Sequence, residues 1–257
     1  MVKKILRIVL WVITGAALIT LFVFGRKHFL ETPLKGIDFQ LERSHDKGFV
    51  DVDSVISYVE TATKIKHQAQ ISSIDVIKIR QWIDSNPWVA QSLAYIGLND
   101  TLIIRAKEYE PVLRVFNQDQ RSVYVTNEGF LVPSNPEYTP RTIVANGDFL
   151  FPTLRKKTSI TDSTYAHTGI SEALAIVQAI KKDDFLTSNI GQIYKKDNEY
   201  ELMVNNLSAR VIVGDTCQID NKLERLKRLL QKYSGTEELK QYKTLSLRYK
   251  NQIVCTK

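Results

Sequence analysis

The sequence predicts an α+β protein behind a single membrane helix near its N-terminus. Three observations lead to this prediction: an unbroken apolar run at residues 8–24, a strand, helix, helix, strand, strand order over residues 36–110, and a strand-rich remainder. We accordingly divide the chain into five parts. A cytoplasmic tail (1–7) precedes a transmembrane anchor (8–25) and a linker (26–35). A first domain (36–110) and a C-terminal mixed β domain with flanking helices (111–257) follow.

The apolar run is long enough to span a bilayer. Residues 8–24 carry no charge, and with Ile5 and Leu6 they would cover roughly 30 Å as a helix, the thickness of a hydrocarbon core. The two sides of the run carry similar numbers of basic residues. The positive charge of the α-amino group adds to the N-terminal side and favours a cytoplasmic N-terminus. The rival interpretation is a cleaved signal peptide, but residues 25–29 contain no small-residue cleavage site. We therefore expect an uncleaved, single-pass anchor.

The formal charge of +7 belongs mostly to the anchor. No acid precedes Glu31, and the run is flanked by Lys3, Lys4, Arg7, Arg26 and Lys27. The remaining chain therefore lacks a strongly basic face for phosphate, and its aromatic residues do not alternate with basic runs as a single-strand binder requires. We expect no nucleic-acid partner. The hydrophobic content of 44% is sufficient for buried cores.

The cysteines and histidines show no metal-binding spacing. Cys217 and Cys255 form no CxxC pair, and the four histidines stand apart without an HExxH pattern. If this region lies outside the cytoplasm, a disulfide between the two cysteines is chemically feasible. The alternative, with at least equal weight, is two small apolar residues on neighbouring elements. We expect no metal, no cofactor and no small-molecule substrate.

The first domain is expected to open with a strand and two helices. Residues 36–43 alternate apolar and polar side chains, as a half-buried strand does. Asp51 or Asp53 can cap a helix that turns Val55, Ile56 and Val59 inward. The hydroxyls of Ser72-Ser73 are expected to start a second helix that ends before Pro87. Its buried side chains are expected to be Val76, Ile79, Trp82 and Ile83.

A hairpin completes the first domain. Asn86-Pro87-Trp88-Val89 leads into a strand that reaches Tyr95, and the turn residues 97–100 return the chain as a strand over residues 101–107. One face of the returning strand is apolar, since Leu102, Ile104 and Ala106 alternate along it.

The C-terminal domain begins with three short strands at residues 112–116, 122–126 and 130–132. A proline-containing surface loop follows at residues 133–140, and residues 151–168, rich in Thr, Ser and Lys, are predicted to form a mobile loop. An amphipathic helix is predicted from the spacing of Ile170, Ala173, Leu174, Val177 and Ile180.

The last part of the chain is expected to form a hairpin, a strand, a helix and two closing strands. Residues 190–194 and 199–204 flank Lys196-Asp197-Asn198, and a further strand covers residues 209–213. The helix is expected to bury Ile219, Leu223, Leu226, Leu230 and Tyr233, with Asn221 and Glu224 as a capping pair. Its opposite side carries a basic stripe, either a solvated face or a docking surface, made of Lys222, Arg225, Arg228 and Lys232. The closing strands cover residues 244–249 and 252–256.

Several motifs carry a resemblance to a known family. Asn86-Pro87-Trp88-Val89, Thr101-Leu102-Ile103-Ile104 and Glu108-Tyr109-Glu110-Pro111-Val112 follow one another behind a single anchor. The first domain resembles a POTRA domain, and the whole chain resembles the FtsQ/DivIB family of bacterial cell-division proteins. Ser246-Leu247-Arg248-Tyr249 is similar to the closing segment of that family, with Ser246 in place of an acid. Asn127 likewise stands where an acid is usual.

The resemblance implies a non-catalytic scaffold in the inner membrane at the division septum, with its bulk in the periplasm. Its implied partners are FtsB- and FtsL-like division proteins, with FtsK, FtsW and FtsI as further ones. The closing strand leaves main-chain groups unpaired and can accept a strand from another chain. The implied docking residues are Arg248, Tyr249, Gln252, Ile253, Val254 and Cys255, with Arg225 and Arg228 as weaker candidates.

Two other classes of protein remain as alternatives. Ser44-His45-Asp46-Lys47 matches the SxxK spacing of penicillin-interacting enzymes, but the companion motifs are absent and the serine follows a strand. POTRA domains also occur in protein-translocation and chaperone components, which carry tandem copies or a membrane β-barrel. The first alternative is an anchored cell-wall enzyme and the second a translocation component, and we expect neither.

Overall fold

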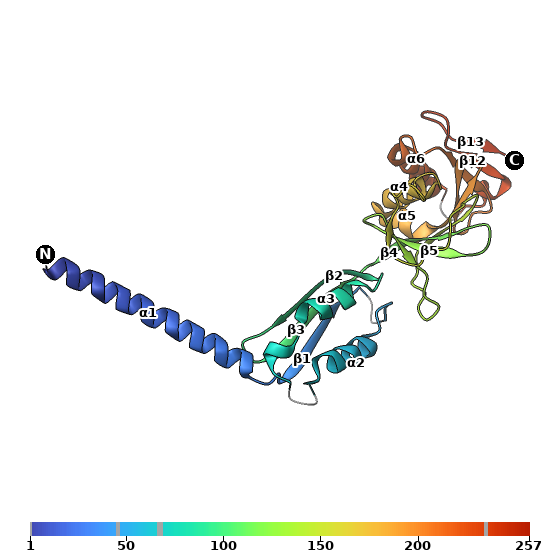
Figure 1. Ribbon diagram of the computed structural model, residues 1–257. Coiled ribbons are helices and arrows are strands. Elements are labelled where there is room, and N and C mark those ends of the chain that lie inside the picture. The colour runs from blue at the N-terminus through green and yellow to red at the C-terminus, as the bar shows by residue number, and fades with distance from the viewer. Residues whose placement is uncertain (1, 45–46, 66–68, 234–235) are drawn as a thin grey trace. The chain divides into compact units, whose positions relative to one another are not determined.

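The computed structural model describes residues 2–44, 47–65, 69–233 and 236–257. It shows a mixed α+β protein with an apolar N-terminal helix and a large mixed sheet, as the sequence predicts (Figure 1). The chain forms two compact units. The first comprises Met1–Arg43 and Val50–Glu108, and the second comprises Ser44–Phe49 and Tyr109–Lys257.

The N-terminal helix α1 spans Val2–Glu31. Among the described residues, it alone is long and apolar enough to cross a membrane, over Val9–Glu31. Its large apolar side chains are exposed on all sides, Trp11 by 74% and Phe22 by 72%, as lipid-facing side chains are. The helix continues beyond the predicted anchor, so residues 26–31 of the predicted linker are helical. The first proline in the sequence is Pro33, so no proline interrupts the helix before Glu31.

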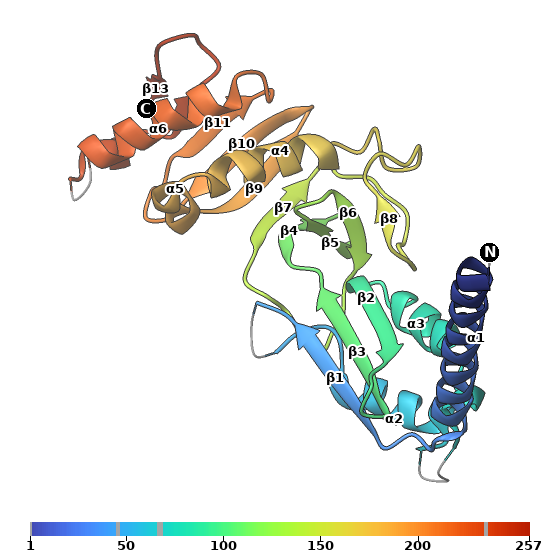
Figure 2. The same ribbon diagram turned by 90° about the vertical axis from the view of Figure 1, so that its left-hand side faces the viewer.

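The part of the first unit that follows α1 contains a three-stranded sheet and two main helices (Figure 2). Its elements are β1 (Gly36–Glu42), α2 (Val52–Thr63), the 3₁₀ turn η2 (Ile71–Ser73), α3 (Val76–Asp84), β2 (Val89–Ile96) and β3 (Thr101–Glu108). The strand order is β1-β3-β2, with β1 parallel and β2 antiparallel to β3. Leu102, Ile104 and Ala106 on β3 are buried, which confirms the predicted apolar face.

The two helix starts of this unit differ in how well they were predicted. Asp51 caps α2, as expected, and its carboxylate accepts hydrogen bonds from the amides of residues 53 and 54. The predicted start at Ser72-Ser73 is wrong, because Asp75 caps α3 by accepting from the Lys78 amide at 3.0 Å. Trp82, expected in the core, is 37% exposed and stacks on Tyr58 with ring centroids 3.7 Å apart.

The second unit is built on one ten-stranded mixed sheet. Its strands are β4 (Pro111–Phe116), β5 (Ser122–Thr126), β6 (Phe130–Pro133), β7 (Ile143–Gly147), β8 (Thr158–Ser159), β9 (Ile190–Lys196), β10 (Glu199–Val204), β11 (Arg210–Gly214), β12 (Thr244–Ser246) and β13 (Val254–Thr256). They lie in the order β13-β12-β11-β10-β9-β7-β4-β5-β6-β8. Helices α4 (Ile170–Lys181), α5 (Asp184–Asn189) and α6 (Ile219–Lys232) contact one another beside the sheet, and the 3₁₀ turn η3 (Glu238–Gln241) precedes β12.

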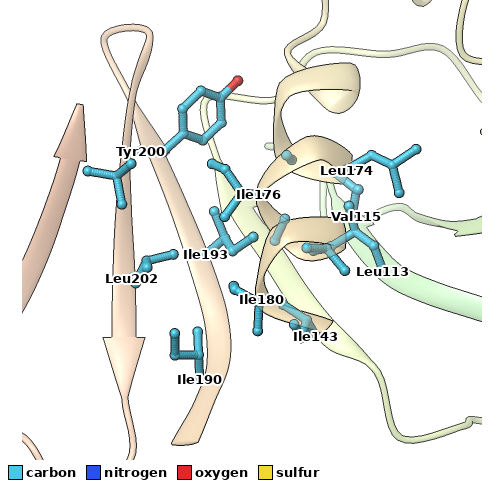
Figure 3. Close-up of a cluster of buried hydrophobic side chains, with 14 of the residues drawn as sticks. Leu113, Val115, Ile143, Leu174, Ile176, Ile180, Ile190, Ile193, Tyr200 and Leu202 are labelled. Atoms are coloured by element: carbon cyan, nitrogen blue, oxygen red, sulfur yellow. The ribbon is translucent and has the colours of Figure 1, made fainter. Parts of the chain in front are cut away.

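The core of this unit lies where α4 packs on the centre of the sheet. Figure 3 shows Ile176 and Ile180 of α4 pointing towards Ile193 of β9 and the neighbouring strands. Leu113 on β4, both helix residues and Ile193 are completely buried. The apolar spacing that predicted this helix is therefore confirmed, and it places α4 over the parallel strands β4, β7 and β9.

Other predictions for the second unit have mixed outcomes. The hairpin between β9 and β10 is confirmed, with Asp197 and Asn198 at φ 49° and 65°, as a two-residue turn between twisted strands requires. Residues 151–168 are not a structureless loop, because Phe151 and Tyr165 are buried and β8 pairs with β6. Strand β7 and helix α5 were not predicted.

Candidate functional site

The strand β13 lies at one edge of the ten-stranded sheet. It pairs antiparallel with β12, Thr244 opposite Thr256 and Ser246 opposite Val254, and has no second neighbour among the described strands. The Lys243 amide also donates to the Thr256 carbonyl at 2.7 Å. Since β12 covers one side of β13 only, the other side offers main-chain groups to a further strand. The edge position expected for the closing strand is thereby observed, although the strand begins at Val254 rather than residue 252.

The side chains of the predicted docking strand differ in exposure. Val254 is 39% exposed, Gln252 is exposed, and Cys255 is partly buried. Ile253 packs against the hydrophobic core of the unit. The edge therefore presents an apolar side chain to solvent while its neighbour fixes the strand to the domain.

Arg225 on α6 connects this helix to the loop between β12 and β13. Its Nη1 donates to the carbonyls of Tyr249 at 2.7 Å and Gln252 at 2.6 Å, and its Nη2 donates to the carbonyl of Leu247 at 3.0 Å. A weaker bond runs from its Nε to the Asn221 carbonyl at 3.4 Å. Arg225 is thus engaged with the protein itself, in a geometry that sequence reasoning did not foresee.

The predicted basic stripe on α6 is not one surface. Lys222 was assigned to the solvated side but is only 7% exposed, and its Nζ donates to the carbonyl and the carboxylate of Asp215 at 2.9 and 2.7 Å. Arg228 is exposed and pairs with Glu224 at 2.9 Å, one helical turn away. These basic side chains do not share one exposed surface, because the chain before α6 folds back over Lys222 and the closing loop folds onto Arg225.

The predicted capping pair of α6 is also wrong. The N-cap is Gln218, in the left-handed region at φ 52°, with no side-chain cap. The Asp215 carboxylate accepts from the Cys217 amide and from Lys222 instead, and the hydrogen bond from Lys222 lowers the pKa of Asp215. The capping-box pattern failed because the helix already includes Ile219, so Asn221 lies within its first turn, and Glu224 pairs with Arg228.

Arg248 and Tyr249 precede the edge strand. Arg248 pairs with Glu199 of β10, a partner that sequence reasoning missed because the two positions are distant in the chain. Gly214, at φ 75°, leaves room for it, since a Cβ there would stand 3.0 Å from Arg248 Cγ. The Tyr249 side chain is 49% exposed, so it is not part of the core. Its carbonyl is held by Arg225 while the ring faces solvent.

The cysteines and Ser44 show no arrangement for chemistry. Cys217 and Cys255 are both free, so the feasible disulfide is not formed, and burial raises the pKa of the Cys255 thiol. Ser44 Oγ donates to Glu110 Oε2 at 2.8 Å. The other SxxK positions His45 and Asp46 lie outside the described residues. Within the part of the chain that the structure describes, no three His, Cys, Asp or Glu side chains gather as metal ligands.

Comparison with known proteins identifies the family. The model described as FtsQ/DivIB, C-terminal related, matches residues 110–256, which include the ten-stranded sheet and the edge strand β13. A search of curated proteins found no match to the chain. The match covers more than half of the sequence, and it supports a role in cell division. The chain therefore belongs to the FtsQ/DivIB, C-terminal related family, which is a family of non-enzymatic division proteins.

Proposed function

We propose that this protein is a membrane-anchored scaffold of the bacterial division machinery that docks FtsB- and FtsL-like partners on the edge strand β13. The observation that carries the proposal is the position of β13 at the end of the sheet, with one side of the strand unpaired among the described residues. A strand from another chain can extend such an edge, because main-chain hydrogen bonds give affinity and side-chain pockets give specificity.

The side chains around β13 fit this kind of docking. Val254 on the strand and Tyr249 before it are 39% and 49% exposed. Tyrosine and apolar side chains are typical of the centre of an interface. Tyrosine brings a large rigid contact area with few rotatable bonds. Ile253 and Cys255 are anchored inward and would hold the strand while it accepts its partner.

The charge around β13 indicates the chemistry of the partner. From residue 239 onward the chain has no acid. Its basic residues there are Lys240, Lys243, Arg248, Lys250 and Lys257, of which Arg248 is paired with Glu199 and Lys240 with Glu237. A partner strand with acidic residues would be attracted to this edge and a basic one would be repelled, so complementarity favours an acidic partner.

The remaining parts of the scaffold follow from the anchor and the first unit. In this proposal α1 holds the protein in the inner membrane, with its N-terminus in the cytoplasm and the chain that follows α1 in the periplasm at the septum. The first unit, as a POTRA-like domain, would supply contacts to further division proteins such as FtsK, FtsW and FtsI. Assembly on this scaffold, rather than catalysis, would then time septal wall synthesis.

The test is a titration of the full chain in lipid nanodiscs with the extracytoplasmic segment of the FtsB-like protein of the same organism, with and without its FtsL-like companion. The wild type is compared with a truncation after Lys250, which removes β13. We expect the wild type to bind and the truncation to lose binding. Circular dichroism of both forms is the control, because a truncated form that loses its helix and strand signals reports unfolding rather than a missing edge.

The proposal fails if the folded wild type does not bind these segments, or if the folded truncation binds as tightly as the wild type. A second variant, Tyr249→Glu, keeps the whole strand and answers the same question should the truncation unfold.

A further inference from the structure

We infer that Arg225 is a positioning residue that orders the docking edge from beneath, and that it is not itself a contact for the partner. The inference rests on the proposed function, since it assigns a role within the same edge. Three carbonyls of the loop between β12 and β13, those of Leu247, Tyr249 and Gln252, converge on the guanidinium of Arg225.

The loop depends on Arg225 because it belongs to no regular element. Residues 247–253 lie between two strands of three residues each. Among the described residues, they make two other polar contacts: the Leu247 amide donates to the Ile212 carbonyl at 2.8 Å, and the Arg248 side chain pairs with Glu199. Both lie at the start of the loop. Hydrogen bonds from a charged donor to main-chain carbonyls are stronger than neutral ones, so Arg225 holds the second half of the loop.

Four of the five donors of Arg225 are occupied. A guanidinium has five N–H groups. In Arg225 the Nη1 atom serves two carbonyls, Nη2 serves one, and Nε reaches the Asn221 carbonyl of its own helix. All four acceptors are main-chain carbonyls rather than carboxylates. Arg225 therefore acts on a partner through the loop that it holds.

The position of Arg225 is set by the core. Leu223 and Leu226, on either side of it in α6, are buried with 2% and 0% exposure. These side chains fix the rotation of the helix, and Arg225 consequently faces the closing loop. Arg225 thus links helix α6 to the loop that precedes the edge strand.

The experiment compares four forms of the full chain in lipid nanodiscs: wild type, Arg225→Met, Arg225→Lys and Arg228→Met. Methionine keeps the length of the arginine stem and removes every donor, while lysine keeps the charge and part of the hydrogen bonding. Arg228 is the matched control for the exchange comparison, because it lies one turn further on the same helix and pairs with Glu224 of that helix. The readouts are amide hydrogen exchange, thermal unfolding, and binding kinetics with the FtsB-like segment.

In Arg225→Met we expect the amides of residues 247–256 to exchange at least about tenfold faster, while the amides of α4 and β9 are unchanged, because lost loop bonds shift the population towards a disordered edge. Association with the FtsB-like segment should slow in proportion to the loss of the ordered fraction while dissociation changes little, because only the ordered fraction is competent to bind. Arg225→Lys should be intermediate, and Arg228→Met should show the exchange rates of the wild type at residues 247–256, because it leaves the loop carbonyls held by Arg225.

Two results would overturn the inference. One is unchanged exchange at residues 247–256 in Arg225→Met, which would show that the loop is ordered without it. The other is normal association with fast dissociation, which is the signature of a lost direct contact. If the wild type does not bind the segment, the proposed function fails, whereas the exchange comparison still decides whether Arg225 orders the edge.

Discussion

The centre of the ten-stranded sheet and its β13 edge are held together in different ways. In the centre, α4 packs on β4, β7 and β9, and side chains such as Leu113, Ile180 and Ile193 are completely buried (Figure 3). At the edge, β13 has a single neighbour and its preceding loop is held by the hydrogen bonds of Arg225. Apolar burial contributes most of the free energy of folding, whereas a few hydrogen bonds direct a local conformation. In the proposed function, stability and docking are therefore carried by separate parts of one sheet.

The largest expected effect is a loss of stability caused by a cavity in the centre of the sheet. Ile180→Ala removes a completely buried side chain from α4 and should lower the free energy of unfolding by about 2–5 kcal/mol, because the packed strands cannot close the space. Chemical denaturation of the full chain in nanodiscs, followed by circular dichroism, measures this loss.

The matched change at the edge is Val254→Ala, which shortens a side chain that is already 39% exposed. It should alter the free energy of unfolding by less than about 1 kcal/mol, since little apolar area leaves the protein interior. Equal losses for Ile180→Ala and Val254→Ala would contradict the division between a stabilising centre and a docking edge.

A smaller effect, on binding rather than stability, is expected at Tyr249. Tyr249→Glu replaces an exposed ring beside the basic edge with a carboxylate and should weaken binding of the FtsB-like segment by about 2 kcal/mol or more, as loss of an interface anchor does. Isothermal titration with the full chain measures the change.

Two further substitutions separate the causes of that loss. Tyr249→Phe keeps the ring and should bind nearly as the wild type does, whereas Tyr249→Gln removes the ring without adding charge. If Tyr249→Gln also binds normally, the ring is not an anchor and the effect of glutamate is electrostatic. The free energy of unfolding should be the same in all three variants, because the main-chain carbonyl of residue 249 remains available to Arg225.

The same comparison explains what could be predicted from the sequence. The strands and α4 in the centre were predicted because their burial imposes a regular apolar spacing, and Ile170 to Ile180 follow it. Strand β7 was missed because Ile143–Gly147 is a short strand that follows a proline-containing loop and shows no clear alternation. Residues 151–168 were misjudged because their polar composition conceals buried anchors such as Phe151 and Tyr165.

At the candidate site, the sequence predicted the edge strand but not its supports. The exposures of Tyr249 and Val254 fit the prediction, whereas Lys222 and Arg225 were read as parts of one basic face. A helical repeat shows which residues share a side, but it does not show which of them another segment will cover. The acceptors of Arg225 are main-chain carbonyls, and every residue has one, so no residue type in the sequence marks them.

The smallest expected effect is a pH-dependent change in stability at the junction between α5 and α6. Lys227 of α6 donates to Asp183, the N-cap of α5. This hydrogen bond lowers the pKa of Asp183 below its ordinary value of 3.8 and raises the pKa of Lys227 above its ordinary value of 10.5. A lowered carboxyl pKa adds stability that is complete above the ordinary value and is lost as the pH falls through the folded value. A raised amine pKa adds stability that is lost only as the pH rises above 10.5.

The pair should therefore stabilise the native state between about pH 4 and pH 10 and fade in acid. Asp183→Asn tests this, because asparagine still caps α5 by accepting from the Leu186 amide through Oδ1, while an uncharged NH2 group replaces the oxygen that accepts from Lys227. The urea midpoint of Asp183→Asn should lie slightly below that of the wild type at pH 7, and the difference should shrink towards pH 3. Binding of the FtsB-like segment should not change at pH 7, since the pair does not reach β13. A pH-independent difference would mean that the asparagine disturbs the cap, and a change in binding would mean that the junction of α5 and α6 is coupled to the edge after all.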